Sequence, residues 1–125
     1  MTRILLAEDE VAMREYLTRA LEKSGYEVVA VDRGTDAAPL LAEQFFDLLL
    51  TDIVMPEMDG IELARHCAKV SPKTEVMFIT GFSGVALRAG ESVPQAKILS
   101  KPFHLKDLVL EVERLFNREA ATGQL

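Results

Sequence analysis

Five short apolar runs that alternate with longer amphipathic segments constrain the fold of this 125-residue chain more than any other feature. The runs predict strands at residues 4–7, 28–31, 48–51, 76–80 and 97–100. The first four runs are almost continuously apolar, as is typical of strands that are covered on both faces. This alternation favours the α/β class, with a (βα)5 doubly wound parallel five-stranded sheet, right-handed crossovers and helices on both faces.

The amphipathic segments predict five helices of unequal regularity. We expect Gly25 to end the first helix. Thr35 is expected to cap the second, with Pro39 in or just after its first turn, where a proline is tolerated. The third should bury Ala68 on its apolar face. The fourth segment, between residues 82 and 95, contains glycine and proline, which predicts a short or irregular helix.

Length and charge limit the classes of function. We expect one domain at residues 1–118 and a flexible C-terminal tail at residues 119–125. The net charge of −6 disfavours binding to nucleic acid or to an anionic membrane surface. Cys67 is the only cysteine, so no internal disulfide can form. The N-terminal apolar run is too short for a signal peptide, and no segment approaches a membrane span. A cytoplasmic protein is therefore expected.

Reactive side chains stand at the carboxyl ends of the predicted strands. They are, in chain order, Glu8, Asp9, Glu10, Asp52, Thr80 and Lys101. Taken singly, the first acids could stabilise a helix N-terminus and Asp52 could form an Asx turn. However, the carboxyl ends of parallel strands meet at one edge of the sheet, where folds of this kind bind ligands. The combination therefore predicts one crevice that holds several carboxylates, a hydroxyl and an ammonium group.

The chemistry of such a crevice suits phosphoryl transfer to a carboxylate. Clustered carboxylates need a cation, and ligands that are all oxygen favour Mg²⁺. A carboxylate can attack phosphorus and form an acyl phosphate, while the metal, a lysine and a hydroxyl stabilise the phosphoryl oxygens. The sequence contains neither of the glycine-rich phosphate loops, GxxxxGK[ST] or GxGxxG, so it does not support nucleotide binding.

The acidic pair at positions 8 and 9, the stretch LLLTDIVMPEMDG, the stretch FITG and the tripeptide KPF at position 101 together resemble the receiver domain of two-component response regulators (CheY-like). The resemblance covers essentially the whole chain and implies the flavodoxin-like strand order 2-1-3-4-5. It implies that Asp52 is the phosphoacceptor. It also implies that Asp9 and Asp52 ligate Mg²⁺ directly, Glu8 through water and Val54 through its backbone carbonyl.

The same resemblance assigns roles to the residues on the other side of the crevice. Thr80 would donate a hydrogen bond to the phosphoryl group, and Lys101 would form an ion pair with it. It also suggests a cis peptide bond between Lys101 and Pro102. Ile98 stands where many receivers carry a tyrosine or phenylalanine that moves on activation. We therefore expect the loop at Thr80 to carry the switch, with Phe82 either as the side chain that changes environment or as a core plug.

The stretches MFITGF, AKILSKP and HLKDLV are similar to the stand-alone CpdR-type regulators. This similarity implies a phosphorylation-switched protein that a histidine kinase or histidine phosphotransfer protein supplies, and that contacts an output protein, the ClpXP protease. Such a protein catalyses only its own phosphorylation and dephosphorylation, so we do not expect an enzyme. One alternative is a phosphorelay intermediate that passes the phosphoryl group from Asp52 to a histidine phosphotransfer protein. A weaker alternative is an aspartyl-phosphate hydrolase, which Val54 disfavours because such enzymes carry a second aspartate at that position.

Overall fold

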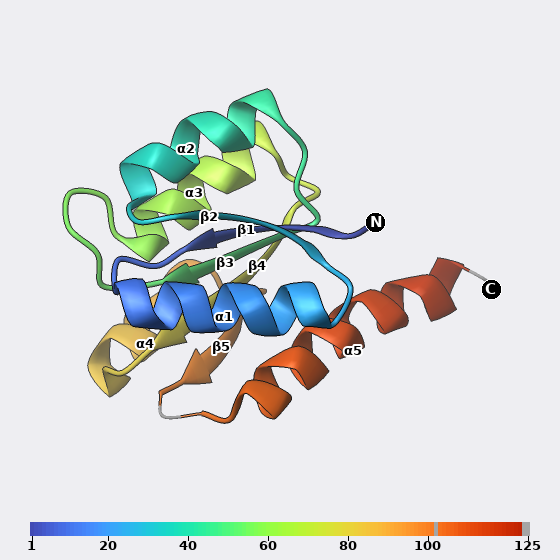
Figure 1. Ribbon diagram of the computed structural model, residues 1–125. Helices are drawn as coiled ribbons and strands as arrows, with labels where there is room; N and C mark the ends of the chain where they lie inside the picture. The colour runs from blue at the N-terminus through green and yellow to red at the C-terminus, as the bar shows by residue number, and fades with distance from the viewer. Residues whose placement is uncertain (102, 124–125) are drawn as a thin grey trace.

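The computed structural model describes residues 1–101 and 103–123, and in this part of the chain five strands alternate with five helices (Figure 1). In chain order the elements are β1 (Arg3–Ala7), α1 (Val11–Lys23), β2 (Glu27–Val31), α2 (Gly34–Glu43), β3 (Leu48–Asp52), α3 (Gly60–Val70), β4 (Glu75–Thr80), α4 (Ser83–Ser92), β5 (Lys97–Ser100) and α5 (Leu105–Gly123). Each predicted strand is present, and four of the five are one residue longer than predicted. One of these added residues is Asp52, which lies within β3 as its last residue.

The strands form one parallel sheet in the order β2-β1-β3-β4-β5. This confirms the predicted fold class and the strand order that the resemblance implied. Every residue of β3 is buried, as expected for the central strand of a sheet with two covered faces. The chain crosses from β1 to β2 on one side and then returns past β1 to β3, so the switch in direction lies between β1 and β3.

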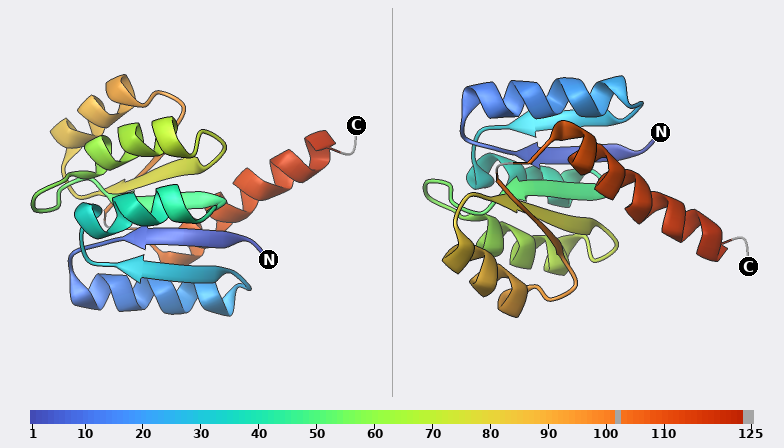
Figure 2. Two further views of the ribbon diagram at one scale, coloured as in Figure 1. Left: turned by 90° about the horizontal axis from the view of Figure 1, so that it is seen from above. Right: turned by 90° about the horizontal axis from the view of Figure 1, so that it is seen from below.

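Helices cover both faces of the sheet, with α1 and α5 on one face and α2, α3 and α4 on the other (Figure 2). Successive strand residues point to opposite faces. Accordingly, Ile4 and Leu6 pack with α1 and α5, whereas Leu5 and Ala7 pack with α2 and α3. The two hydrophobic layers hold the strands in place, and the loops at the carboxyl ends of these strands contain the candidate site.

The ends of two helices follow from local backbone chemistry. Helix α1 ends just before Gly25, whose φ of +97° is accessible to glycine at little cost. Helix α3 begins after Asp59, whose carboxylate accepts a hydrogen bond of 2.9 Å from the backbone N–H of Glu62. Helix α4 has ten residues and ends before Pro94, so it is short, as predicted.

Three expectations about the helices were wrong. Thr35 does not cap α2, because the helix begins at Gly34 and its N-cap residue is Arg33. A Cβ at Gly34 would lie 2.7 Å from the carbonyl oxygen of Met58, so close packing against the β3–α3 loop requires a glycine there. Pro39 consequently falls in the second turn of α2, inside the helix. Ala68 is exposed, and Leu63 takes its place on the buried face of α3.

Helix α5 continues to Gly123, past the predicted domain boundary at residue 118, and projects beyond the sheet (Figure 1). The flexible tail at residues 119–125 stays a prediction, since residues 124 and 125 lie outside the described residues. None of the helices in the described ranges combines the length and apolar composition that a membrane span requires.

Candidate functional site

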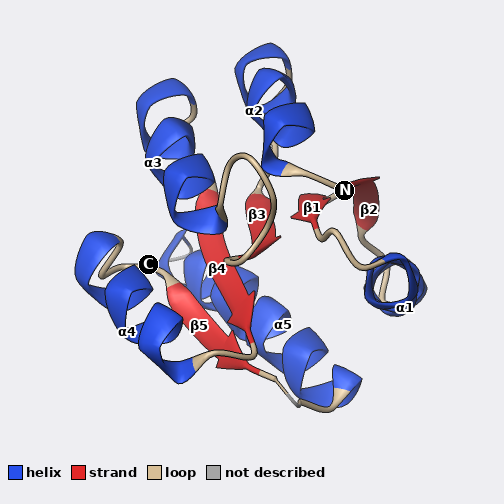
Figure 3. Cartoon of the chain, turned by 90° about the vertical axis from the view of Figure 1, so that its left-hand side faces the viewer, coloured by secondary structure: helices blue, strands red, loops and turns tan. Residues whose placement is uncertain are grey.

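The candidate site lies where the loops after β1, β3, β4 and β5 meet at one end of the sheet, the end that faces the viewer in Figure 3. Strand pairing brings its acids together, because Ala7 of β1 pairs with Thr51 of β3. The residue that follows each of these two contributes a carboxylate: Glu8, just after β1, and Asp52, the last residue of β3. Carboxylate oxygens of Glu8, Asp9 and Asp52 all lie within 4.8 Å of one another.

Glu8 is buried although it is an acid, and its contacts explain how the fold tolerates it. Its carboxylate accepts hydrogen bonds of 3.2 Å from the backbone N–H of Glu10 and from the ammonium group of Lys101. Burial and the nearby charge of Asp52 raise the pKa of Glu8 to about 7, and the contacts with Glu10 and Lys101 only partly oppose this rise. The Glu8 carboxyl group therefore titrates near neutral pH when no further cation is present.

Lys101 joins the two buried acids. Its Nζ lies 3.2 Å from Oε1 of Glu8 and 3.2 Å from Oδ2 of Asp52. The backbone positions it, since the Lys101 N–H donates a 2.7 Å hydrogen bond to the carbonyl of Thr80 at the end of β4. Partial burial alone would lower the pKa of Lys101, but the carboxylates of Asp52 and Glu8 outweigh burial and raise it. The ammonium group is thus held charged against both carboxylates. The predicted cis bond to Pro102 lies outside the described residues.

Thr80 is buried at the end of β4, beside these groups in the sheet. Its hydroxyl oxygen accepts a 3.1 Å hydrogen bond from the backbone N–H of Phe82. Phe82 itself is 61% exposed, so the core-plug alternative is wrong. The role of Thr80 toward a phosphoryl group stays a prediction, as does that of Val54, which lies in the β3–α3 loop with its side chain exposed.

Gly60 has a structural role beside Asp52 that its position in the sequence did not reveal. A Cβ at this position would lie 2.2 Å from the carbonyl oxygen of Asp52 and 2.9 Å from Cα of Ile53. The N–H of Gly60 donates a 2.8 Å hydrogen bond to the carbonyl of Ile53. The start of α3 therefore packs directly on the backbone of Asp52, and only a residue without a side chain fits there.

Two basic residues near the site were missed in the sequence. The guanidinium group of Arg14 donates a 2.9 Å hydrogen bond to the backbone carbonyl of Glu8. Arg33 lies 3.7 Å from the carboxylate of Glu57, which also accepts a hydrogen bond from Thr35. Glu57 has a φ of +69°, which is uncommon for a residue other than glycine. A cation in the first turn of α1, where the helix dipole disfavours positive charge, was the available sequence signal for Arg14.

The donor set of the carboxylate cluster fits a hard divalent cation. Its three groups offer only oxygen atoms, which suits Mg²⁺ and other hard ions better than metals that prefer nitrogen or sulfur. Asp9 is exposed, so an incoming ion can keep several of its waters, as Mg²⁺ usually does. These residues therefore match the acidic cluster that the sequence predicted.

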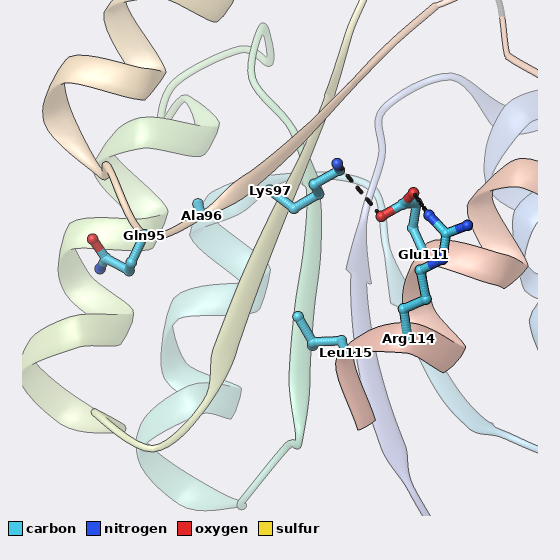
Figure 4. Close-up of a pocket in the computed structure, with 6 residues that line it drawn as sticks. All are labelled: Gln95, Ala96, Lys97, Glu111, Arg114 and Leu115. Atoms are coloured by element: carbon cyan, nitrogen blue, oxygen red, sulfur yellow. Dashed lines mark hydrogen bonds and ion pairs between the residues drawn. The ribbon is translucent and has the colours of Figure 1, made fainter. Parts of the chain in front are cut away.

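A pocket between β5 and α5 has a different character (Figure 4). It is at the other end of β5, which starts at Lys97 and is followed by Lys101. Lys97 and Arg114 both contact the carboxylate of Glu111, at 3.5 Å and 3.0 Å. Because one carboxylate engages both cations, they offer little to an anionic ligand. This pocket does not compete with the carboxylate cluster as the candidate site.

Comparisons with known proteins agree with this geometry. The family model described as response regulator receiver domain matches residues 4–113. The response regulator receiver protein CpdR of Brucella abortus (strain 2308) is 58% identical over 116 residues, which are 92% of this chain and 97% of that protein. A response regulator receiver protein from Sinorhizobium medicae WSM419 has a solved structure with 32% identity and a TM-score of 0.85, covering 93% of this chain and 94% of its own. The response regulator protein TrrA from Thermotoga maritima, solved in complex with Mg(2+)-BeF, has 30% identity and a TM-score of 0.83, covering 92% and 99%.

Proposed function

The chain belongs to the response regulator receiver family, and from this membership we propose that it is a phosphorylation switch in which Asp52 accepts a phosphoryl group. The donor in this proposal is a histidine kinase or a histidine phosphotransfer protein. The phosphorylated and unphosphorylated forms then differ in their contact with an output protein. The proposal makes the protein a regulator that catalyses only its own phosphorylation and dephosphorylation.

The observation that carries the proposal is the position of Lys101 between two buried acids. Its ammonium group lies 3.2 Å from Asp52 and 3.2 Å from Glu8. An ammonium group so close to the Asp52 carboxylate can move onto a phosphoryl oxygen when one is attached there, with little rearrangement. A purely structural ion pair would need only one acid. The second buried carboxylate, that of Glu8, adds a desolvation cost that an ion pair between Lys101 and Asp52 would avoid.

Mg²⁺ is the metal in this proposal, with Asp9, Asp52 and the Val54 carbonyl as direct ligands and Glu8 as a ligand through water. When bound, Mg²⁺ supplies positive charge that offsets the negative charge of the phosphoryl oxygens. The oxygen-only donors within 4.8 Å of one another support this assignment. The complex of TrrA with Mg(2+)-BeF is consistent with it, because that protein shares the fold at 30% identity.

The proposed chemistry needs only a few groups of this chain. An oxygen of Asp52 attacks the phosphorus atom of a phosphohistidine, the P–N bond breaks, and the imidazole leaves with the electron pair of that bond. Lys101 then pairs with a phosphoryl oxygen, and the hydroxyl of Thr80 donates a hydrogen bond to another. Thr80 is buried at the end of β4, which neighbours β3 on the side opposite β1, and this position supports the role.

For the output partner we propose the ClpXP protease, with this protein acting as an adaptor in the cytoplasm. The support is the 58% identity to CpdR, which extends over 92% of this chain. A pull-down with wild type and Asp52→Ala in parallel, both treated with acetyl phosphate and Mg²⁺ so that only the wild type is phosphorylated, tests this part. Capture of the protease by neither form, or by both forms equally, would contradict it.

Labelling with acetyl phosphate tests the phosphoacceptor. We expect Mg²⁺-dependent incorporation in the wild type and none in Asp52→Asn. Asp32→Asn is the matched control, because Asp32 follows β2 at the same edge of the sheet but is exposed, and it should label like the wild type. Label that persists in Asp52→Asn, or that is recovered on a histidine or serine, would overturn the proposal.

A further inference from the structure

The turn between β1 and α1 contains a backbone carbonyl, that of Glu8, that accepts no hydrogen bond from the sheet or from the helix backbone within the described residues. The N–H of Glu8 makes the last sheet-like bond, 3.1 Å to the carbonyl of Val31. Helix α1 opens with the bond from the N–H of Arg14 to the carbonyl of Glu10, at 2.9 Å. The carbonyl of Glu8 lies between these two systems, and the guanidinium Nη1 of Arg14 donates a 2.9 Å hydrogen bond to it.

This carbonyl belongs to the peptide that joins Glu8 to Asp9. A change in the ψ angle of Glu8 turns this carbonyl and also moves the Cα of Asp9, which changes the direction of the Asp9 carboxylate. The side chain of Asp9 is exposed, so packing does little to hold it. The Glu8 carboxylate, by contrast, is buried and held by Lys101 and by the N–H of Glu10. Asp9 therefore depends on the backbone of the turn for its position.

We propose that Arg14 is a positioning residue for the Mg²⁺ site: its guanidinium group fixes the Glu8–Asp9 peptide and thereby aims the Asp9 carboxylate at the oxygens of Glu8 and Asp52. This inference rests on the proposed function, because it concerns how the same site binds its metal. Arg14 is half-buried and makes its contact with a backbone carbonyl instead of one of the neighbouring carboxylates. Its effect is thus on the geometry of the turn.

Positioning by Arg14 and simple charge repulsion predict opposite changes in Mg²⁺ affinity when Arg14 is replaced, so the two explanations can be tested against each other. A cation next to a metal site repels Mg²⁺, so removal of its charge should tighten metal binding. Loss of an outer-shell contact that orients a ligand should instead weaken metal binding, by about 10- to 100-fold. The sign of the change in Mg²⁺ affinity therefore separates positioning from electrostatics.

The experiment uses three variants of the whole chain. Arg14→Met removes the charge and the hydrogen bond but keeps an unbranched side chain, whereas Arg14→Lys keeps the charge and one type of donor. Arg19→Met is the matched control, because Arg19 is an exposed cation on the same helix, five residues further on. Mg²⁺ affinity is measured by titration of backbone amide shifts, and the shifts of residues 8–10 are also compared in the metal-free proteins.

We expect Arg14→Met to weaken Mg²⁺ binding about 10-fold or more, in the range of lost outer-shell contacts, and to shift the metal-free amide signals of Asp9 and Glu10. Arg14→Lys should restore part of the affinity, and Arg19→Met should bind Mg²⁺ as the wild type does or slightly more tightly. At saturating Mg²⁺, labelling of Arg14→Met should approach the wild-type maximum. Equal or tighter Mg²⁺ binding by Arg14→Met, or no recovery in Arg14→Lys, would overturn the inference.

Failure of this inference is distinguishable from failure of the proposed function. If the wild type is labelled on Asp52 but Arg14→Met binds Mg²⁺ normally, only the role of Arg14 is wrong. If the wild type binds no Mg²⁺ and takes no label, the proposed function itself is wrong.

Discussion

The backbone N–H of Phe82 donates a hydrogen bond of 3.1 Å to the hydroxyl oxygen of Thr80, which ties the start of the β4–α4 loop to a buried residue at the strand end. A hydroxyl can accept one hydrogen bond and donate another. Thr80 can therefore keep its bond to Phe82 while its proton turns toward a phosphoryl oxygen on Asp52. Movement of the hydroxyl would then pull the loop with it, and the exposed ring of Phe82 would change its surroundings.

Thr80→Ala should uncouple phosphorylation from this movement. We expect Thr80→Ala to accept label on Asp52, because it keeps the carboxylates and Lys101. The backbone amide shifts of residues 80–92 should respond to beryllofluoride in the wild type but not in this variant. Thr80→Ser retains a hydroxyl and should respond as the wild type does. If residues 80–92 stay unchanged in the wild type while a distant face shifts, the loop is not the switch.

Gly60→Ala should destabilise the protein and displace Asp52. The added Cβ would lie 2.2 Å from the carbonyl oxygen of Asp52, so the backbone of β3 or α3 must move. Overpacking of this kind costs about 1–3 kcal/mol. Gly84→Ala is the control, since a Cβ there meets no atom within 4 Å and an alanine in a helix should stabilise by about 0.4–1 kcal/mol. Urea denaturation measures both changes, and equal stability of the two variants would refute the close contact.

The metal-free protein should lose stability as the pH rises from about 4.5 to about 7. Burial and the charge of Asp52 raise the pKa of Glu8 from 4.5 to about 7, so the folded state binds more protons than the unfolded state in this window. The stability that protonated Glu8 contributes is complete below pH 4.5, the pKa of the unfolded state, and is lost as the pH rises through about 7, the pKa of the folded state. In Glu8→Gln this part of the pH dependence should be absent.

Urea denaturation without Mg²⁺, at several pH values, measures the difference between wild type and Glu8→Gln. Mg²⁺ should make the stability of the wild type fall less steeply with rising pH, because a bound cation favours the charged carboxylate of Glu8. A wild type whose stability relative to Glu8→Gln is constant between pH 4.5 and pH 7 would contradict the raised pKa of Glu8.

Asp9 and Glu10 should differ sharply in their effect on Mg²⁺ binding. Asp9 offers a carboxylate oxygen within 4.8 Å of those of Glu8 and Asp52, whereas the cluster does not include the side chain of Glu10. Asp9→Asn should therefore weaken Mg²⁺ binding by more than the about 10- to 100-fold that loss of an outer-shell contact costs. Glu10→Gln removes the same charge from the neighbouring position and should change the affinity little. Comparable losses in the two variants would show that charge alone, and not ligation, governs the site.

The sequence by itself determined the architecture and the location of the site. Short apolar runs that alternate with amphipathic segments are a local property, and they predict a parallel sheet because the physics of burial acts on each segment in the same way. The carboxyl ends of such strands share one edge of the sheet, so the sequence alone predicts that Asp52 and Lys101 lie together. The errors at Thr35 and Pro39 arose at the start of α2, where Gly34 lies against Met58 of another loop, a contact that the local sequence does not show.

Tertiary structure alone decided the contacts that give the site its chemistry. Lys101 reaches Glu8 across 93 positions of sequence because the crossovers bring these segments together. Gly60 packs on the carbonyl of Asp52 because the β3–α3 loop turns the start of α3 back onto β3. The role of Arg14 depends on a backbone carbonyl that the sheet and the helix both leave without a partner. Such contacts depend on distances of a few ångströms that only the folded chain fixes. Hydrophobic periodicity specifies which face of a segment is buried, but it does not specify which atoms then meet.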